Sequence, residues 1–188
     1  MAKIPSYSLG ILVSLFLAVE AHATDLPVRN WDFSQPMEGR MVPGWRLEQH
    51  AGEPAYEMML VPDTENPGNS AFRIRRTKEE VYGLIAQEIP LNAPLGQDVE
   101  ISARMKTDGV GPGGWVLVLD MIGRSHRILP PTSLKQVRSA PLSGNSEWSV
   151  VKVRATIPAN TTTIEISAML LDAGTGWVDD VRATLQTP

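Results

Sequence analysis

Cysteine is absent from the 188-residue sequence. A chain exported to an oxidising compartment would therefore have no disulfide bonds, and a packed core or a bound ion would have to stabilise it. Histidine is nearly as scarce, and neither His50 nor His126 lies in an HExxH or HxH spacing. Because no GxSxG elbow is present either, histidine-based zinc sites and serine-hydrolase triads lack their usual sequence signatures.

Positive charge is also limited. The chain has 17 Lys and Arg residues against 21 Asp and Glu residues, and its formal net charge is −4. No Lys/Arg run is longer than Arg75-Arg76. We therefore expect no nucleic-acid partner, because nucleic-acid grooves depend on clustered positive charge. The stretch 109–114 reads GVGPGG, which suits a turn better than a phosphate-binding loop.

Long apolar runs are confined to the N-terminus. The run Leu9–Val19 follows Lys3 and precedes the triplet Ala21-His22-Ala23, as in a secretory signal that is cleaved after Ala23. It is much shorter than the roughly 20 residues that a membrane-spanning helix needs. We therefore expect residues 1–23 to be a signal peptide and residues 24–188 to form one exported domain, periplasmic or secreted, with no membrane span after cleavage.

Alternating apolar and polar side chains dominate the rest of the chain. From Val99 to Lys106 the apolar residues alternate with Glu100, Ser102 and Arg104, which is the period of a half-buried strand. Strand patterns also occur at 71–76, 82–89, 115–122, 151–157, 164–170 and 177–185. The segment 115–121 is apolar on both faces, which predicts a central strand with both sides covered.

Clusters of proline and glycine separate these strands, and long helical patterns are missing. This organisation predicts an all-β fold, an antiparallel β-sandwich of the jelly-roll type. Thr77 and Glu80 match a capping box, which predicts one short helical turn at Thr77–Val81. The weakly patterned stretch Arg124–Ala140 is predicted to be a mobile loop.

Acidic residues leave one enzymatic alternative open. A glycosidase needs only two carboxylic acids at a fixed separation, which a sequence cannot show. Asp120 is the most suggestive acid because it interrupts an apolar stretch, where burial would raise its pKa. Alternatively, Asp120 ends its strand at a turn, since Gly123 follows closely.

Several short motifs follow one another in a characteristic order: NWDF from Asn30, then Gly44-Trp45, GNSAFRI, YGLIAQEIPL, VEISARMK, EWSVVKVRATIP, IEISAMLL and GWVDDV. In this order they resemble the galactose-binding-like jelly-roll carbohydrate-binding modules that are attached to cellulases and xylanases. The resemblance covers Asn30–Leu185. It implies a β-sandwich that binds a carbohydrate in a groove or on a concave sheet face.

The resemblance also implies a structural calcium ion near the sheet edge. Asp179 or Asp180 would supply a carboxylate, and the segment that contains Asp32 would supply further oxygens, because calcium requires six to eight oxygen ligands. The alternative is that one aspartate only forms a hydrogen bond with the N-terminal strand.

Residues for sugar binding follow from the same resemblance: stacking rings and polar groups beside them. The candidates are Tyr56, Tyr82, Gln87, Arg104, Lys106 and Trp115. Trp115 could equally belong to the core, Gln87 could satisfy a backbone group inside the sandwich, and the polar side of the Arg104 strand could simply face solvent. Trp45, Trp148 and Trp177 match positions that such modules use for core packing, whereas Trp31 has no assigned role.

The sequence thus predicts an exported, non-enzymatic protein that binds a glycan or a cell-envelope polysaccharide. One alternative is a structural or protein-interaction sandwich with a protein partner in the envelope. The other is a small glycoside-active enzyme.

Overall fold

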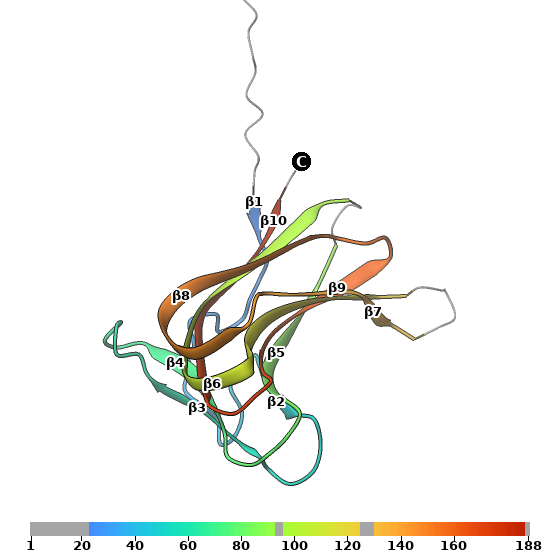
Figure 1. Cartoon of the computed structure of the whole chain (residues 1–188). Helices are drawn as coiled ribbons and strands as arrows, with labels where there is room; N and C mark the ends of the chain where they lie inside the picture. Colours follow the sequence, from blue (N-terminus) through green and yellow to red (C-terminus); the bar gives the residue numbers. More distant parts are fainter. Residues whose placement is uncertain (1–22, 93–95, 125–129, 187–188) are drawn as a thin grey trace, which may run out of the picture.

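A computed structural model describes residues 23–92, 96–124 and 130–186 (Figure 1). These residues form strands and connecting loops, and none of them is helical. The strands are β1 (Ala23–Asp25), β2 (Arg46–Gln49), β3 (Tyr56–Pro62), β4 (Ser70–Arg76), β5 (Gly83–Pro90), β6 (Asp98–Gly123), β7 (Thr132–Arg138), β8 (Leu142–Thr156), β9 (Thr161–Leu170) and β10 (Thr175–Gln186). No helix in this part of the chain is long and apolar enough to cross a membrane.

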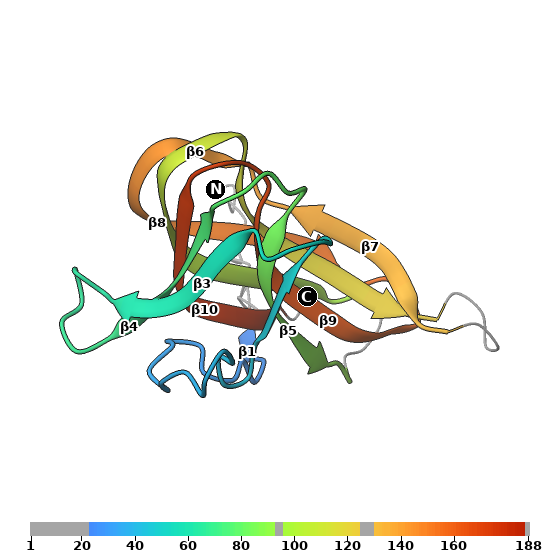
Figure 2. The ribbon, with the colours of Figure 1, turned by 90° about the horizontal axis from the view of Figure 1, so that it is seen from below.

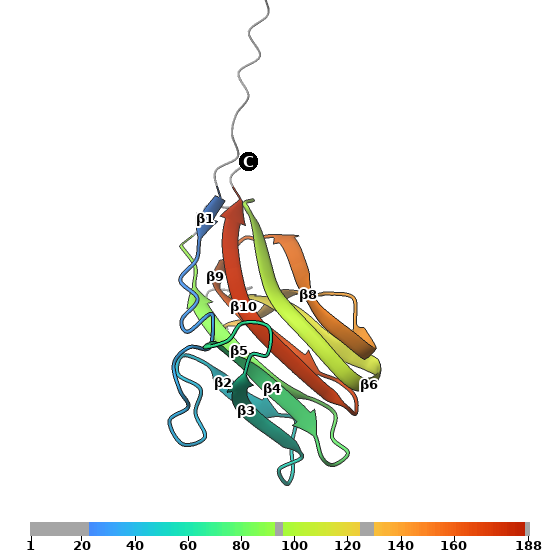
Figure 3. The ribbon, with the colours of Figure 1, turned by 90° about the vertical axis from the view of Figure 1, so that its left-hand side faces the viewer.

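The 26-residue strand β6 connects the two layers of the sandwich. Its first half pairs with β10 on one side and β8 on the other, whereas its second half pairs with β9 and β7. All of these pairs are antiparallel. We call the layer of β8, the first half of β6, β10, β4 and β3 sheet I, and the layer of β2, β5, β9, the second half of β6 and β7 sheet II (Figures 2 and 3).

Glycine allows β6 to bend between the two sheets. The stretch 109–114 was expected to be a turn, but the strand continues through it with shifts in register against β8. Gly109 and Gly114 have positive φ values, +60° and +82° respectively, outside the ordinary strand region. Side chains rarely adopt this conformation, so glycine permits the bend without backbone strain.

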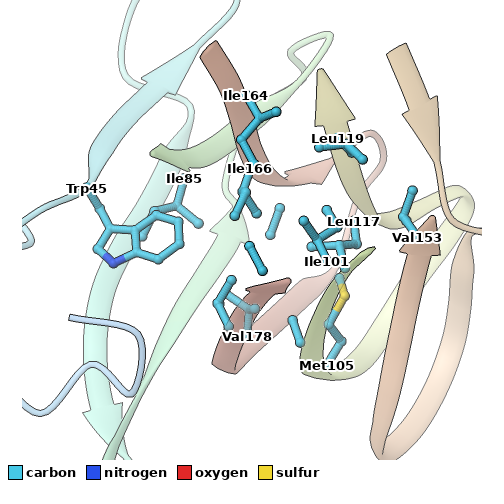
Figure 4. Packing of buried hydrophobic residues seen from close by; sticks show 14 of the residues in the cluster. Trp45, Ile85, Ile101, Met105, Leu117, Leu119, Val153, Ile164, Ile166 and Val178 are labelled. Atoms are coloured by element: carbon cyan, nitrogen blue, oxygen red, sulfur yellow. The ribbon is translucent and has the colours of Figure 1, made fainter. Parts of the chain in front are cut away.

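The core lies between the inner faces of the two sheets (Figure 4). From sheet I, Ile101, Met105 and Val178 point inward, and from sheet II, Ile85 and Leu117 do so. All five are at most 1% exposed. For the segment Val99–Lys106, period-two alternation therefore predicted the buried side of the strand correctly. The central strand expected at 115–122 is confirmed as the second half of β6, between β9 and β7.

Two further local predictions were wrong. No helical turn forms at Thr77–Val81: the backbone N–H and the hydroxyl of Thr77 both donate to the Ala55 carbonyl, 2.8 and 3.0 Å away. The Thr77 hydroxyl therefore holds a loop instead of capping a helix. Much of the expected loop Arg124–Ala140 is strand β7, which pairs with β6 from Val118 to Gly123. Residues 125–129 and the predicted signal peptide up to residue 22 lie outside the described residues.

Candidate functional site

The outward face of sheet II carries a row of acidic side chains across three neighbouring strands. Glu88 on β5 is paired with Glu165 on β9, and Glu165 is paired with Asp120 on β6. Directly paired residues on neighbouring strands project side by side, with their Cβ atoms about 5 Å apart. In the next row, Ala86 and Ser167 are paired and almost fully buried, so small side chains lie beside the acids.

Arg46 on β2 reaches over this face. Its guanidinium lies 3.0 Å from Glu48 and 3.6 Å from Glu88, and its Nη2 lies 3.0 Å from Glu165, which is two strands away. Arg46 itself pairs with Ala86, so the arginine side chain must cross that small residue to reach Glu165. One arginine thus organises three carboxylates.

Asp120 has partners of its own. The Ser133 hydroxyl donates to one of its oxygens at 2.6 Å, and the Gln136 amide donates to the other at 3.4 Å. Asp120 is neither buried nor at a strand end, because β6 continues to Gly123 and its side chain is partly exposed. Both explanations that the sequence suggested for this residue are therefore wrong.

Glu165 is the least solvated acid of the row. Burial raises its pKa, the positive charge of Arg46 lowers it, and the carboxylates of Glu88 and Asp120 raise it further. The net result is a raised pKa. Such a group binds a hydroxyl or a cation more strongly than an exposed carboxylate does, because less water competes for it.

Tyr82 lies at the other end of the same face. It directly precedes β5, and the carbonyl of Tyr82 accepts a 3.1 Å hydrogen bond from the backbone of His50, which continues the pairing of β2 with β5. Alternation along the chain places Tyr82 on the side of Leu84, Ala86 and Glu88. Its ring meets that of His50 edge-on, with centroids 5.6 Å apart. Tyr82 and Glu88 are separated by roughly 20 Å along the strand.

A cavity of about 580 Å³ adjoins the acidic row. Arg46 and Glu88 line it on the sheet side, and Met41, Pro43 and Trp45 line it from the segment that precedes β2. The face therefore offers an open concavity next to its charged groups, as small-molecule sites commonly do.

Two of the sequence-predicted ligand residues have structural roles instead. Trp115 is fully buried, and its Nε1 donates to the Trp177 carbonyl at 2.9 Å. Gln87 is 3% exposed and points inward, where its amide binds both the N–H and the carbonyl of Arg29. Both side chains are therefore held by contacts within the protein. The alternatives of a core tryptophan and a backbone-satisfying glutamine are the correct ones.

Arg104 lies on the outward face of sheet I, apart from the acidic row of sheet II. Its guanidinium is surrounded by four carboxylates: Asp63 at 3.1 Å, Glu65 at 3.3 Å, and Asp179 and Asp180 both at 3.4 Å. We call these five residues the Arg104 cluster. Trp148 completes the site, since the guanidinium carbon lies 4.7 Å from the centroid of a Trp148 ring. Arg104 thus ties the loop after β3 to the bulge in β10.

The Arg104 cluster does not fit the expected calcium site. Asp179 and Asp180 face a guanidinium in place of a metal ion, and Asp32 caps its own turn by accepting from the N–H and hydroxyl of Ser34. Within residues 23–92, 96–124 and 130–186, no group of three or more His, Asp or Glu side chains is arranged to hold a metal ion. The positive charge that these aspartates require comes from the chain itself.

Asp179 is the buried centre of the Arg104 cluster. It has no exposed surface, one of its oxygens accepts from the Asp180 N–H at 2.8 Å, and the other accepts from the Asn69 amide at 3.0 Å. Burial raises the pKa of Asp179 to about 7, and the negative charges of Asp180 and Asp63 act in the same direction. The hydrogen bond from Asp180 and the charge of Arg104 only partly oppose this rise.

Tyr56 lies away from the acidic row, at the open side of the sandwich. It lines a cavity of about 560 Å³ between the edge strands β2 and β3, together with Leu47, Met58 and Met59. Its ring packs over Gly83, where an added Cβ would come within 2.8 Å of the ring. Burial raises the pKa of Tyr56. The structure therefore does not bring Tyr56 together with Tyr82 on one face.

The tryptophans divide between core and surface. Trp45 packs in the core, 5.4 Å from the ring of Phe33, as expected. Trp148 and Trp177 were expected in the core, but both lie half-buried on the outward side of sheet I. Trp31 is 39% exposed and lies beneath the Arg182 guanidinium, 5.0 Å from it.

Sequence reasoning missed Arg46 and Glu165. The spacing of Glu165 between Ile164 and Ile166 showed that it points outward, but nothing local indicated that it would lie beside Glu88 and Asp120. Arg46 directly follows the Gly44-Trp45 motif, which is the one sequence signal that could have drawn attention to it.

The sequence matches no protein-family model, and no curated protein matches it either. Solved structures do match. A family 4 carbohydrate-binding module superposes with a TM-score of 0.52 at 19% identity over 85% of this chain and 100% of that chain. A family 61 module, solved in complex with β-1,4-galactotriose, gives 0.53 at 18% identity over 85% and 98%. The fold is that of carbohydrate-binding modules.

A phage protein shares the same fold. The enzymatically active domain of bacteriophage CBA120 tailspike protein 4 gives a TM-score of 0.63 at 12% identity, over 85% of this chain. This chain spans only 21% of that tailspike chain. At these identities the similarity establishes the fold and leaves the activity to be argued from the site.

Proposed function

We propose that this protein is an exported, non-enzymatic carbohydrate-binding sandwich that holds a glycan on the outward face of sheet II. The observation that carries the proposal is the row Glu88, Glu165 and Asp120, with Arg46 across it and a cavity beside it. Carboxylates accept hydrogen bonds from sugar hydroxyls, and a guanidinium donates to sugar oxygens. The shared fold with carbohydrate-binding modules supports this assignment.

Tyr82 supplies the stacking element. It is the sequence-predicted ring that lies at this face, and it is partly exposed. A tyrosine ring offers apolar surface to the C–H side of a pyranose, and its two rotatable bonds cost little entropy when they are ordered. The face therefore combines one ring with several charged groups, which suits a polar, hydroxyl-rich chain.

A glycoside-active enzyme is the second candidate, because a retaining glycosidase uses two neighbouring acids, and strand pairing places Glu88, Glu165 and Asp120 side by side. The partners of these acids argue against it. Arg46 holds Glu165 and Glu88, while Ser133 and Gln136 hold Asp120, so each acid of the row is already engaged by a neighbouring side chain.

The test is a glycan-array screen of the purified protein, followed by titration of the best ligand into Glu165→Gln and Tyr82→Ala. We expect Glu165→Gln to lower the affinity roughly 10-fold to 100-fold, because a hydrogen bond to a charged group contributes about 1.5–3 kcal/mol. Glu100→Gln, on the opposite sheet, is the matched control and should bind normally. Reducing-end release from the same ligand is measured in parallel. Absence of glycan binding, or normal binding by both variants, would reject the proposal.

A further inference from the structure

A stripe of alternating rings and cations crosses the outward face of sheet I. Trp177 on β10 is paired with Lys106 on one side and Arg73 on the other, and Arg73 is paired with Met59 on the edge strand β3. Trp148 on β8 lies opposite the segment that contains Lys106, between the pairs formed by Ser149 and Ser146. We call these five residues the Trp177 stripe. It belongs to the opposite sheet from the acidic row.

The stripe is accessible from solvent. Met59 is 40% exposed, and the side chains of Lys106 and Arg73 are 29% and 28% exposed. Trp177 and Trp148 are half-buried. A ring in this position is fixed by its neighbours yet still presents surface, which is the usual condition of an aromatic group that binds a ligand.

The cations beside Trp177 have poor partners within the protein. The Arg73 Nε is buried and makes no hydrogen bond with any of the described residues. Its Nη2 donates to the Met59 sulfur at 3.0 Å, a weak acceptor, and lies 3.7 Å from Glu57. Glu57 forms its shorter contact, 2.7 Å, with Arg75. A buried donor without an acceptor is costly. The Arg73 guanidinium could therefore accept an oxygen ligand, because the described chain supplies none within hydrogen-bond distance.

Lys106 also has only a weak partner within the protein. Its only ion-pair partner among the described residues is Glu147, 3.4 Å away, and the Glu147 side chain is 87% exposed. Exposed pairs of this kind contribute little to stability and exchange readily. Arg104, by contrast, already contacts four carboxylates of the chain, so we do not expect it to bind a further anion.

From these contacts we infer that the Trp177 stripe is a second carbohydrate site, and that it binds an acidic sugar, a pyranose that bears a carboxylate. The Trp177 ring takes the apolar side of the pyranose, and the carboxylate lies against the solvent-exposed end of the Arg73 guanidinium, whose Nη groups donate to its two oxygens. Lys106 contacts the neighbouring residue of the glycan on the other side of the ring. A guanidinium matches a carboxylate with two parallel hydrogen bonds, which makes the site selective for the charged sugar.

The probe is a trisaccharide of galacturonic acid, and its methyl ester is the matched control ligand, because esterification removes the charge and keeps the ring. Binding is measured by isothermal titration calorimetry at low and at moderate salt. We expect the acid form to bind at least about tenfold more tightly than the ester, with an affinity that falls as salt rises. Equal affinity of the two forms would overturn the inference, as would no binding of the acid form.

Variants locate the site. Arg73→Gln and Trp177→Leu should each weaken binding of the acid form about tenfold or more. Arg73→Lys should bind more tightly than Arg73→Gln but less tightly than the wild type, because lysine lacks the two-donor fork. Lys152 lies on the same face but already forms an ion pair with Glu100, so Lys152→Gln should bind normally. Glu165→Gln and Tyr82→Ala should also bind normally, which separates this site from the one on sheet II. If Arg73→Gln is folded, as judged by its melting temperature, and binds like the wild type, the assignment is wrong.

Discussion

Gln87 holds the main chain of Arg29 on both sides. The Arg29 N–H donates to Oε1 at 2.7 Å, and Nε2 donates to the Arg29 carbonyl at 2.9 Å, although the two residues are 58 positions apart. The contact ties the irregular segment before β2 to the inner side of β5. The neighbouring Asn30 is fixed as well, because its carbonyl accepts from the Trp45 indole at 3.1 Å.

Replacing Gln87 with alanine should therefore lower the free energy of unfolding by about 1–3 kcal/mol, since two part-buried hydrogen bonds to the backbone are lost. Chemical denaturation measures the change. Gln87→Glu is the informative companion: it keeps one acceptor but loses the donor to the Arg29 carbonyl, so it should also destabilise. A neutral effect of Gln87→Ala would show that water satisfies Arg29 equally well.

Trp115 and Trp177 should respond very differently to truncation. Trp115 is fully buried, and its ring packs against Gly176, so Trp115→Ala should cost about 3–5 kcal/mol of stability. Trp177→Ala removes a half-buried side chain on the outward face and should cost much less. Urea unfolding curves of the two variants provide the comparison, and similar losses would contradict the assignment of one ring to the core and the other to the surface.

Stability should depend on pH through Asp179. Its folded-state pKa is raised to about 7, above the ordinary value of an unfolded aspartate, so the folded state retains a proton that the unfolded state has released. The contribution of this group is fully present below the unfolded pKa and is lost as pH rises towards the folded value. We expect the melting temperature to fall between pH 5 and pH 8 in the wild type and to fall less in Asp179→Asn. A wild-type melting temperature that rises over this range would contradict the direction of the shift.

Arg104 should make added calcium unnecessary. Its guanidinium already lies between Asp63, Asp179 and Asp180, where a cation would have to bind, so calcium and a chelator should leave the wild-type melting temperature unchanged. Arg104→Met should lower stability by about 3 kcal/mol or more, because buried carboxylates lose their partner. Calcium should then raise the melting temperature of the variant, since the freed oxygens suit a hard cation. A large effect of calcium on the wild-type protein would instead support the site that the sequence suggested.

The fold was predictable because side-chain alternation is a local property. The pattern at Val99–Lys106 determines which side of β6 is buried, whatever its neighbours are. Where a local signal had a competing explanation, prediction failed. Thr77 and Glu80 resemble a helix cap, but no helical turn forms, because the Thr77 hydroxyl donates to the Ala55 carbonyl instead. The stretch that forms β7 has little alternation, and it becomes a strand because β6 offers it an unpaired edge.

The sequence by itself determined that this chain forms an antiparallel β-sandwich and, in its alternating strands, which side chains face the core. Only the tertiary structure decided where charge gathers. Glu88, Asp120 and Glu165 lie on strands that are far apart in the chain, and strand order and register alone bring them into one row. In the same way Asp179 and Asp180 came to surround Arg104. Alternation within a strand specifies the side of the sheet on which each side chain lies. A site also requires particular residues on the neighbouring strands, and strand pairing is a long-range property of the chain.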